Sequence, residues 1–243
     1  MSFERAATEI DLRSQSEAYP HLTLTGLAGY YCGLCQPSLV LVMTIALSSP
    51  TLQHQLRQAT KRLHHTLDHH PVLAPLVSPD LTIFQYGNAL EALHGVQVQA
   101  EAGILAFLEK HPGLFDYESR RKLPALESDL AALGRIPVGL DTNFPVPESV
   151  GELIGVLYTI EGSANGGQVI ARLLRQLPFE NLPMAFFSGY GNLSRQRWDE
   201  FIEFAESLCR DEDDREVAAV AAVQTFDAFK RHMDAYLGLL GAQ

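Results

Sequence analysis

The 243-residue chain is poor in cysteine and in positive charge, and both shortages exclude classes of protein. Three cysteines are too few for a disulfide scaffold and favour a reducing, cytoplasmic location. Lys and Arg number 18 against 29 Asp and Glu, a formal net charge of −11. A nucleic-acid partner needs a basic face, so none is expected. Cys32 and Cys35 have redox or metal spacing, but without a second such pair we interpret them as a coincidence.

Residues 1–50 do not match the rest of the chain. A polar stretch precedes the apolar LTLTGLAGYYCGLCQPSLVLVMTIAL, which glycines and a Gln-Pro pair interrupt. The leading segment carries no positive bias, so we do not expect a membrane anchor or a signal sequence. We expect an N-terminal extension over 1–50, with Met43 as the start of the functional chain, and a helical domain over 51–243.

Alternating strand patterns and internal repeats are lacking from residue 51 onward, where helical signals run almost throughout. The first helical segment ends at Pro71. The second opens with the capping residues Ser78 and Asp80, and the third, YESRRKLPALESDLAALG, holds Pro124 as a kink. Three more segments follow at 147–178, 192–208 and 211–240, the last opening on an acidic run that complements the helix dipole. The pattern predicts an all-α single domain.

Four histidines stand within seven positions of the first helical segment, in KRLHHTLDHHP. On a wheel of about 100° per residue, His64 lies at the edge of the apolar stripe, whereas His65 and His69 point towards water. Only His64 is therefore expected to face an interior space while on ordered helix. His65 and His69 have the i, i+4 spacing of a surface metal chelate, but no further ligand is in register, so we interpret them as a solvated face. The predicted buried stripe consists of Leu56, Ala59, Thr60, Leu63 and Leu67.

Arg57 precedes His64 by seven residues, which places it on the same face about 10 Å back along the helix axis. A neutral imidazole and a guanidinium so arranged suit a flat ligand with a metal at its centre and carboxylates at its rim. Haem is such a ligand. The spacing alone leaves an alternative, in which His64 is a hydrogen-bonded boundary histidine and Arg57 an ordinary surface cation.

Three glycines interrupt part of the helical segment 147–178, IEGSANGGQVIARLL, at Gly162, Gly166 and Gly167. Each costs roughly 1 kcal/mol against alanine inside a helix, so about 3 kcal/mol must be offset. Close helix packing explains the i, i+4 pair but explains the consecutive pair less well. A bend over a flat ligand accounts for all three glycines, and we expect it.

The chain resembles the haem oxygenases in five segments that occur in the family's order. LRQATKRLHHTLD is similar to the proximal-helix motif, with Arg57, Thr60 and His64 on the matching positions. LEALHG resembles the second helix, and LYTIEGSANGGQVIARLL the glycine-bearing distal helix. FFSGYGNLSRQRWDEF and AVQTFDAFKRHM resemble the closing segments of the bacterial branch, particularly the haem oxygenases that serve bacterial phytochromes. The resemblance covers about residues 52–240.

The resemblance implies a haem oxygenase-like helical bundle, with haem between a proximal helix and a kinked, glycine-bearing distal helix. His64 would ligate the iron, and Arg57 and Thr60 would help to bind the haem. The distal catalytic residues would be Gly162, Ser163, Gly166 and Gly167, whose backbone approaches the porphyrin and whose serine and ordered water serve bound oxygen. Two departures concern the same helix. Asn165 replaces an apolar or small residue, and Ser163 takes the position of the family's acid or water-holding residue. The basic residues that hold the propionates elsewhere do not align cleanly, and Arg195 and Arg197 are nearby candidates.

The implied reaction uses haem as both substrate and cofactor. O2 and electrons open it to biliverdin, with release of CO and ferrous iron. The electrons would come from an external reductase or ferredoxin, because the chain has no flavin or nicotinamide fingerprint. A bacteriophytochrome that receives biliverdin is a further expected partner. The alternative is a haem-binding or carrier protein on the same fold without turnover.

Two other classes share such a helical scaffold. A di-iron oxidase needs two Glu-x-x-His pairs, and the sequence offers one, at Glu91 and His94. A thiaminase-like hydrolase needs a nucleophilic cysteine in the core, and in the helical region only Cys209 could serve, although no motif surrounds it.

Overall fold

The computed structural model of the protein describes residues 50–241, and within this range every regular element is a helix. The predicted all-α class is thus confirmed. The expectations for the N-terminal extension, Met43 and the Cys32–Cys35 pair lie outside the described residues. The elements are α2 (Leu52–Asp68), η1 (Ala74–Val77), α3 (Ile83–Lys110), η2 (Glu118–Arg120), α4 (Leu123–Ala132), α5 (Val150–Leu174), α6 (Ala185–Ser188), η3 (Gly191–Leu193), α7 (Ser194–Leu208) and α8 (Glu212–Gly241).

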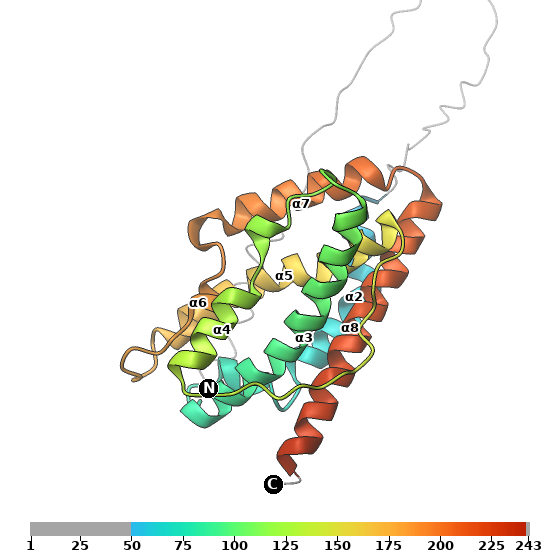
Figure 1. Ribbon diagram of the computed structural model, residues 1–243. Coiled ribbons are helices and arrows are strands. Elements are labelled where there is room, and N and C mark those ends of the chain that lie inside the picture. Colours follow the sequence, from blue (N-terminus) through green and yellow to red (C-terminus); the bar gives the residue numbers. More distant parts are fainter. Residues whose placement is uncertain (1–49, 242–243) are drawn as a thin grey trace, which may run out of the picture. The chain divides into compact units, whose positions relative to one another are not determined.

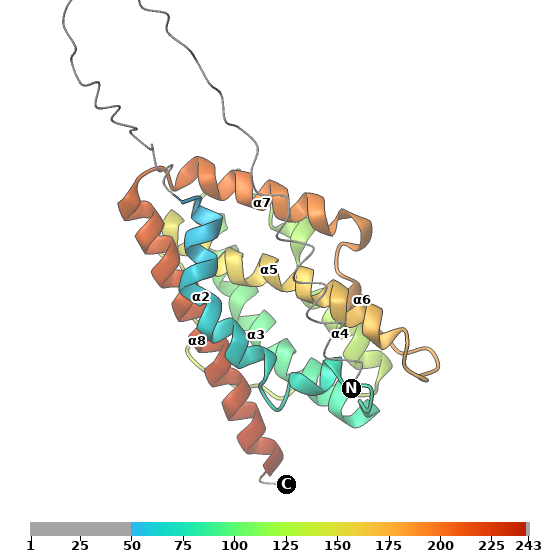
Figure 2. The ribbon, with the colours of Figure 1, turned by 180° about the vertical axis from the view of Figure 1, so that it is seen from behind.

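The two views show opposite faces of the helical domain, each formed by different helices. α3 and α4 face the viewer in Figure 1, and α2 and α5 face the viewer in Figure 2. In both views α8 runs along one edge and α7 crosses one end. α8 packs against both α2 and α5 and so holds these two helices on one face of the domain.

Side-chain caps set the starts of three long helices. The hydroxyl of Thr51 accepts from the backbone N–H of His54 at the start of α2, and Ser149 accepts from Glu152 at the start of α5. At α3, Thr82 and Gln85 form a reciprocal capping box. The prediction that this helix opens at Ser78 or Asp80 was therefore wrong. Thr82 is the N-cap residue, and its capping box with Gln85 sets the start of α3.

Pro124 stands in the first turn of α4 and does not kink the helix. The missing N–H of proline costs no hydrogen bond at that position, since the first turn has no intrahelical acceptor for it. The predicted single helix over YESRRKLPALESDLAALG is accordingly wrong at its start: a short 3-10 turn, η2, comes first and α4 follows.

The close approach of α5 and α8 forms the centre of the core. A Cβ added to Gly155 would lie 2.5 Å from the carbonyl oxygen of Ala218 and 2.6 Å from the Cβ of Ala221, so only glycine fits there. On α2 the buried residues are Leu52, Leu56, Thr60 and Leu67. The prediction of a buried Ala59 was wrong, because the packed stripe of α2 is narrower than the apolar stripe of its sequence. No helix in the described part of the chain is long and apolar enough to cross a membrane.

Candidate functional site on α2 and α5

His64 lies on α2 with its ring 5.8 Å from the ring of Phe226 on α8. Its Nδ1 is 2.9 Å from Oδ2 of Asp68, one helical turn later. This hydrogen bond raises the pKa of His64 above its usual value, while burial and the charge of Arg57 act in the opposite direction. The side chain is 63% exposed, so the expected interior-facing histidine instead lies at an open edge of the α2–α5 face.

The other three histidines of the cluster divide between the surface and the core. His65 and His69 are exposed and stack on each other, with ring centroids 4.3 Å apart, as the prediction of a solvated face requires. His70 is 5% exposed, which makes it the buried member. Its Nε2 lies 3.2 Å from Asp234 on α8, and its Nδ1 accepts from the N–H of Val72. His70 therefore joins the end of α2 to α8.

Thr60 and Tyr158 connect α2 to α5. Thr60 is buried, and its hydroxyl donates to the carbonyl oxygen of Leu56 at 2.8 Å. Burial raises the pKa of Tyr158 above its usual value. A hydrogen bond with the Thr60 side chain and the charge of Arg57 act in the opposite direction. The structure thus brings Arg57, Thr60 and Tyr158 together. With them we group His64 and Asp68 of α2 and the predicted residues 162–166 of α5 as one candidate, which we call the α2–α5 site.

The three predicted site glycines of α5 have three different surroundings. A Cβ on Gly162 would lie 3.5 Å from the ring of Trp198 on α7, an ordinary contact. A Cβ on Gly167 would lie 3.2 Å from the carbonyl oxygen of Phe187, which is tight packing against α6. A Cβ on Gly166 would meet none of the described atoms within 4 Å, and Gly166 is exposed.

The expectation that one bend over a flat ligand explains all three glycines was therefore wrong for Gly167. Close helix packing accounts for that residue, because α6 lies against its backbone. Adjacent helical residues face about 100° apart, so Gly167 faces α6 while Gly166 faces the open side of the helix. Gly166 stays free to present bare backbone on the open side of α5, which is helical from Val150 to Leu174.

Ser163 and Asn165 are exposed on the glycine-bearing part of α5. The Ser163 hydroxyl donates to the carbonyl oxygen of Ile160 at 2.7 Å and accepts from Nζ of Lys122 at 3.3 Å. Asn165 makes the exposed surface of α5 more polar than an apolar or small residue would.

A buried ionic cluster lies behind α5, and sequence reasoning missed it. Glu161 is 2% exposed and accepts from Arg120 at 2.9 Å and from the Tyr190 hydroxyl at 2.9 Å. Arg120 also donates to Glu200 on α7 at 2.8 Å. The available signal was the glutamate itself, which stands next to Gly162 in an otherwise apolar segment. A carboxylate there needs a buried cation.

Arg195 and Arg197, the candidates for propionate contacts, lie on α7 in different environments. Arg195 has a side chain 87% exposed and bonds Asp199 on its own helix at 2.9 Å. Arg197 is partly buried, 3.6 Å from Glu200 and over the ring of Tyr190. Arg197 thus belongs to the cluster behind α5. No described contact joins either arginine to His64, and their propionate role stays a prediction.

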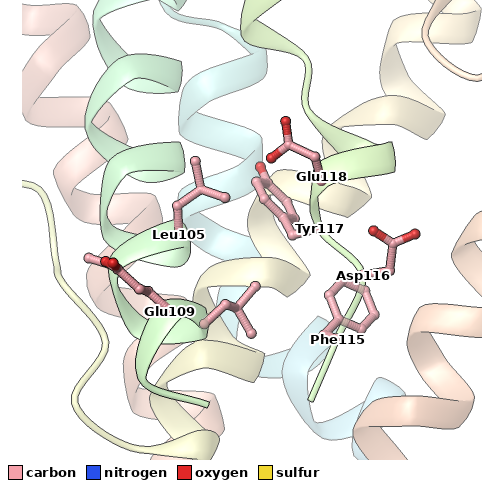
Figure 3. A pocket seen from close by; sticks show the side chains of 8 residues that line it. Leu105, Glu109, Phe115, Asp116, Tyr117 and Glu118 are labelled. Carbon is pink, nitrogen blue, oxygen red and sulfur yellow. The ribbon is translucent and has the colours of Figure 1, made fainter. Parts of the chain in front are cut away.

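A pocket of about 520 Å³ lies elsewhere, between the second half of α3 and the segment before α4 (Figure 3). It offers three carboxylates, Glu109, Asp116 and Glu118, and no cationic side chain among its lining residues. Such a lining repels an anionic ligand. The pocket is therefore a poor site for a dicarboxylate such as haem, and the α2–α5 site fits better.

The residues of the α2–α5 site fit a haem on three counts. Nδ1 of His64 faces a carboxylate, which only accepts hydrogen bonds, so Nδ1 carries the hydrogen and a neutral ring leaves the lone pair of Nε2 for a metal. Arg57 is exposed and forms no ion pair with residues 50–241, so its guanidinium can take a carboxylate. Gly166 provides space that any side chain would fill.

The side chains of Glu91 and Cys209, proposed for the two rival enzyme classes, are both buried. Glu91 binds Arg135 at 3.0 Å and the Tyr236 hydroxyl at 2.6 Å, and residues 50–241 contain no group of three or more side chains placed to hold a metal ion. Cys209 is buried, and burial raises the pKa of its thiol to about 11. A thiol so protonated is a poor nucleophile.

The fold of residues 50–241 is that of the haem oxygenases. The NO- and CO-bound heme oxygenase of Neisseria meningitidis superimposes with a TM-score of 0.64, at 22% identity, over 77% of this chain and 92% of that chain. Heme oxygenase-1 of the cyanobacterium Synechocystis, solved in complex with heme, gives 0.57 at 18% identity, over 79% and 94%. The heme oxygenase of Leptospira interrogans gives 0.59 at 17% identity, over 76% and 100%.

A sequence relative bears the same name as these structures. A protein named heme oxygenase from Xanthomonas campestris pv. campestris is 49% identical over 61 residues, which is 25% of this chain and 35% of that protein. No family model matches the chain. The resemblance to bacterial haem oxygenases is thus confirmed. The assignment to the branch that serves bacterial phytochromes stays a prediction.

Proposed function

We propose that the protein is a haem oxygenase, which uses O2 and electrons to open haem to biliverdin and release CO and ferrous iron. The observation that carries the proposal is the α2–α5 site on this fold. It combines a histidine oriented by Asp68 with a helix that presents bare backbone at Gly166. The haem iron, when bound, supplies the oxygen chemistry.

The residues of α2 would bind and orient the haem. His64 ligates the iron through Nε2, and the bond from Nδ1 to Asp68 sets its tautomer and makes the ring a stronger donor to a metal. Arg57 holds a propionate by charge-assisted hydrogen bonds. Tyr158, placed beside Thr60 and near Arg57, is a second polar group for the same rim.

The residues of α5 would shape the opposite side. Bare backbone at Gly166 lets the helix approach the porphyrin, so that the helix limits the directions open to a small ligand. Gly162 lies against Trp198, and Gly167 against Phe187, so α7 and α6 fix the helix from behind. The Ser163 hydroxyl, exposed on this segment, holds a water at the distal side.

The partners extend the same proposal. An external ferredoxin or reductase would supply the electrons, and a bacteriophytochrome would receive the biliverdin. A cytoplasmic location, predicted from the cysteine content, agrees with both partners. The Neisseria structure, which carries NO and CO, is described in terms of oxygen activation, and the Synechocystis structure contains heme. Both support haem as the ligand of this chain.

The test uses purified protein with hemin, followed by ascorbate or a ferredoxin system in air, with spectra recorded through the reaction. We expect a Soret band that gives way to biliverdin absorption. A Soret band that persists would favour the haem-carrier alternative, and no Soret band would contradict both. The matched control is His64→Ala, which should show neither the histidine-ligated spectrum nor turnover.

A further inference from the structure

Lys122 is a buried lysine directly behind the glycine-bearing part of α5. It is 5% exposed, and its Nζ donates to the carbonyl oxygen of Ile160 and to Oγ of Ser163. Its backbone N–H donates to Glu101 on α3 at 2.7 Å, so α3 fixes the point from which the side chain extends. A buried ammonium costs free energy unless its hydrogen-bond partners are well placed. The position therefore needs a specific reason for lysine.

The carboxylates around Lys122 do not supply that reason, because each already has an arginine. Glu161 is paired with Arg120 at 2.9 Å, and Glu101 with Arg121 at 3.1 Å. Burial lowers the pKa of Lys122, and the two glutamates raise it only in part. The hydrogen bonds of its ammonium go to α5 instead. The lysine therefore acts on α5 rather than as the counter-ion of the cluster.

These hydrogen bonds determine whether the Ser163 hydroxyl can still donate or accept a further hydrogen bond. A serine hydroxyl has one O–H and two lone pairs. The O–H donates to Ile160, and Lys122 donates to one lone pair. One lone pair is left, so Ser163 offers an acceptor and no donor on the exposed side of α5. A water held there points one hydrogen at Ser163 and keeps the other for a ligand.

We propose that Lys122 is a positioning residue for the α2–α5 site: it fixes the turn of α5 from Ile160 to Ser163 and makes the Ser163 hydroxyl an acceptor for a distal water. The expected effect of Lys122 on turnover rests on the proposed haem oxygenase function. Its structural part concerns the protein without haem, and the first experiment addresses that part alone.

Hydrogen exchange of the haem-free protein tests the attachment of α5. In Lys122→Met we expect the amides of residues 160–167 to exchange about tenfold faster than in the parent, because a charge-assisted hydrogen bond to this turn is lost. The amides of residues 150–157 should be unchanged, since Gly155 and its neighbours pack on α8. Lys110→Met, at an exposed lysine of α3, is the matched control and should change neither segment.

Two results would contradict the proposal that Lys122 holds this turn of α5 in place. Parent-like exchange over residues 160–167 would show that Lys122 does not hold α5, and equal acceleration in all helices would show a general packing role. Lys122→Arg, which keeps charge and donors, should restore slow exchange. If Lys122→Met does not fold, Lys122→Gln replaces it in the same comparison, because glutamine keeps a shorter, neutral donor. We expect the amides of residues 160–167 to exchange faster in this variant too, by a smaller factor.

The hemin complex tests whether Lys122 acts through Ser163. We expect Lys122→Met and Ser163→Ala to shift the midpoint of the pH-dependent change in the hemin spectrum in the same direction, and to alter the ratio of biliverdin isomers. In Ser163→Ala the further change Lys122→Met should add nothing to the shift of the midpoint, although it can still alter the isomer ratio through the lost bond to the Ile160 carbonyl. Additive shifts of the midpoint would show that the lysine acts by another route. Failure of hemin to bind would contradict the proposed function and leave the exchange result to decide on Lys122.

Discussion

Nδ1 of His64 lies 2.9 Å from Oδ2 of Asp68, and the two residues are one turn apart on α2. The bond fixes the nitrogen of the ring that carries hydrogen and leaves the lone pair on Nε2. The i, i+4 spacing supplies this geometry locally, without help from a second helix. The histidine is thus oriented before any ligand binds.

Replacement of His64 by alanine should abolish the histidine-ligated hemin spectrum and turnover. His65→Ala and His69→Ala should do neither, because both rings stack on each other at the surface. The measurement is a hemin titration followed in the Soret region for the three variants. Equal damage from His65→Ala would show that the histidine which binds the iron has been misidentified.

Replacement of Arg57 by alanine should raise the dissociation constant of hemin about tenfold, which is the scale of one charge-assisted hydrogen bond. Arg57 is exposed on α2, so the free energy of unfolding should change little. The biliverdin isomers should also become mixed, because the haem can rotate in its plane. Arg62→Ala, another exposed arginine of α2, is the control. Parent-like affinity and isomers would make Arg57 a plain surface cation.

Gly166 and Gly167 should respond in opposite ways to substitution. Gly166→Leu should leave the helical content and stability intact, since leucine is the better helix former and a Cβ there meets no described atom within 4 Å. Its biliverdin formation should be lost or misdirected. Gly167→Ala should lower the melting temperature, because its Cβ would lie 3.2 Å from the Phe187 carbonyl oxygen. Circular dichroism and product analysis check both. Unfolding of Gly166→Leu, or full activity with an unchanged isomer, would contradict the ligand-facing role.

His232 on α8 should make the protein sensitive to acid. The residue is 1% exposed, with Nδ1 3.1 Å from Oγ1 of Thr142. Burial lowers the pKa of His232 below 6.5, and a hydrogen bond with the Ala92 backbone acts in the opposite direction. As the pH falls through about 6.5, His232 is therefore protonated in the unfolded chain but stays neutral in the folded protein. The free energy of unfolding then falls as pH drops below about 6.5.

Denaturant unfolding of the parent and of His232→Gln across this pH range measures the effect. The difference between the two slopes isolates His232 from the other histidines. The variant should lose less stability between neutral pH and pH values below about 6.5 than the parent. Identical slopes in the two proteins would show that the pKa of His232 is the same in the folded and unfolded states.

The local features of the fold and site were predictable from the sequence because they depend on one helix at a time. Periodicity predicts the helices, since the positions of apolar residues report the period of the backbone. The wheel places Arg57 and His64 on one side of α2, and the glycines of α5 stand out because each costs helix stability. The bond between His64 and Asp68 was also within reach, because i, i+4 neighbours meet on any helix.

Other features depended on which helix lies next to which, and no single-helix pattern contains that information. The wheel favours His64 as the interior histidine, yet α8 buries His70. Gly166 and Gly167 are adjacent in sequence, and only the position of α6 makes one a packing residue and leaves the other open.

Lys122 and Ser163 are 41 residues apart and meet because α3 and α5 enclose the start of α4. The sequence by itself thus determined the helices and the side of each on which chemistry could occur. The tertiary structure alone decided which of those side chains lie in the core, which face a ligand and which hold another in place, because burial is a property of the neighbours and not of the residue.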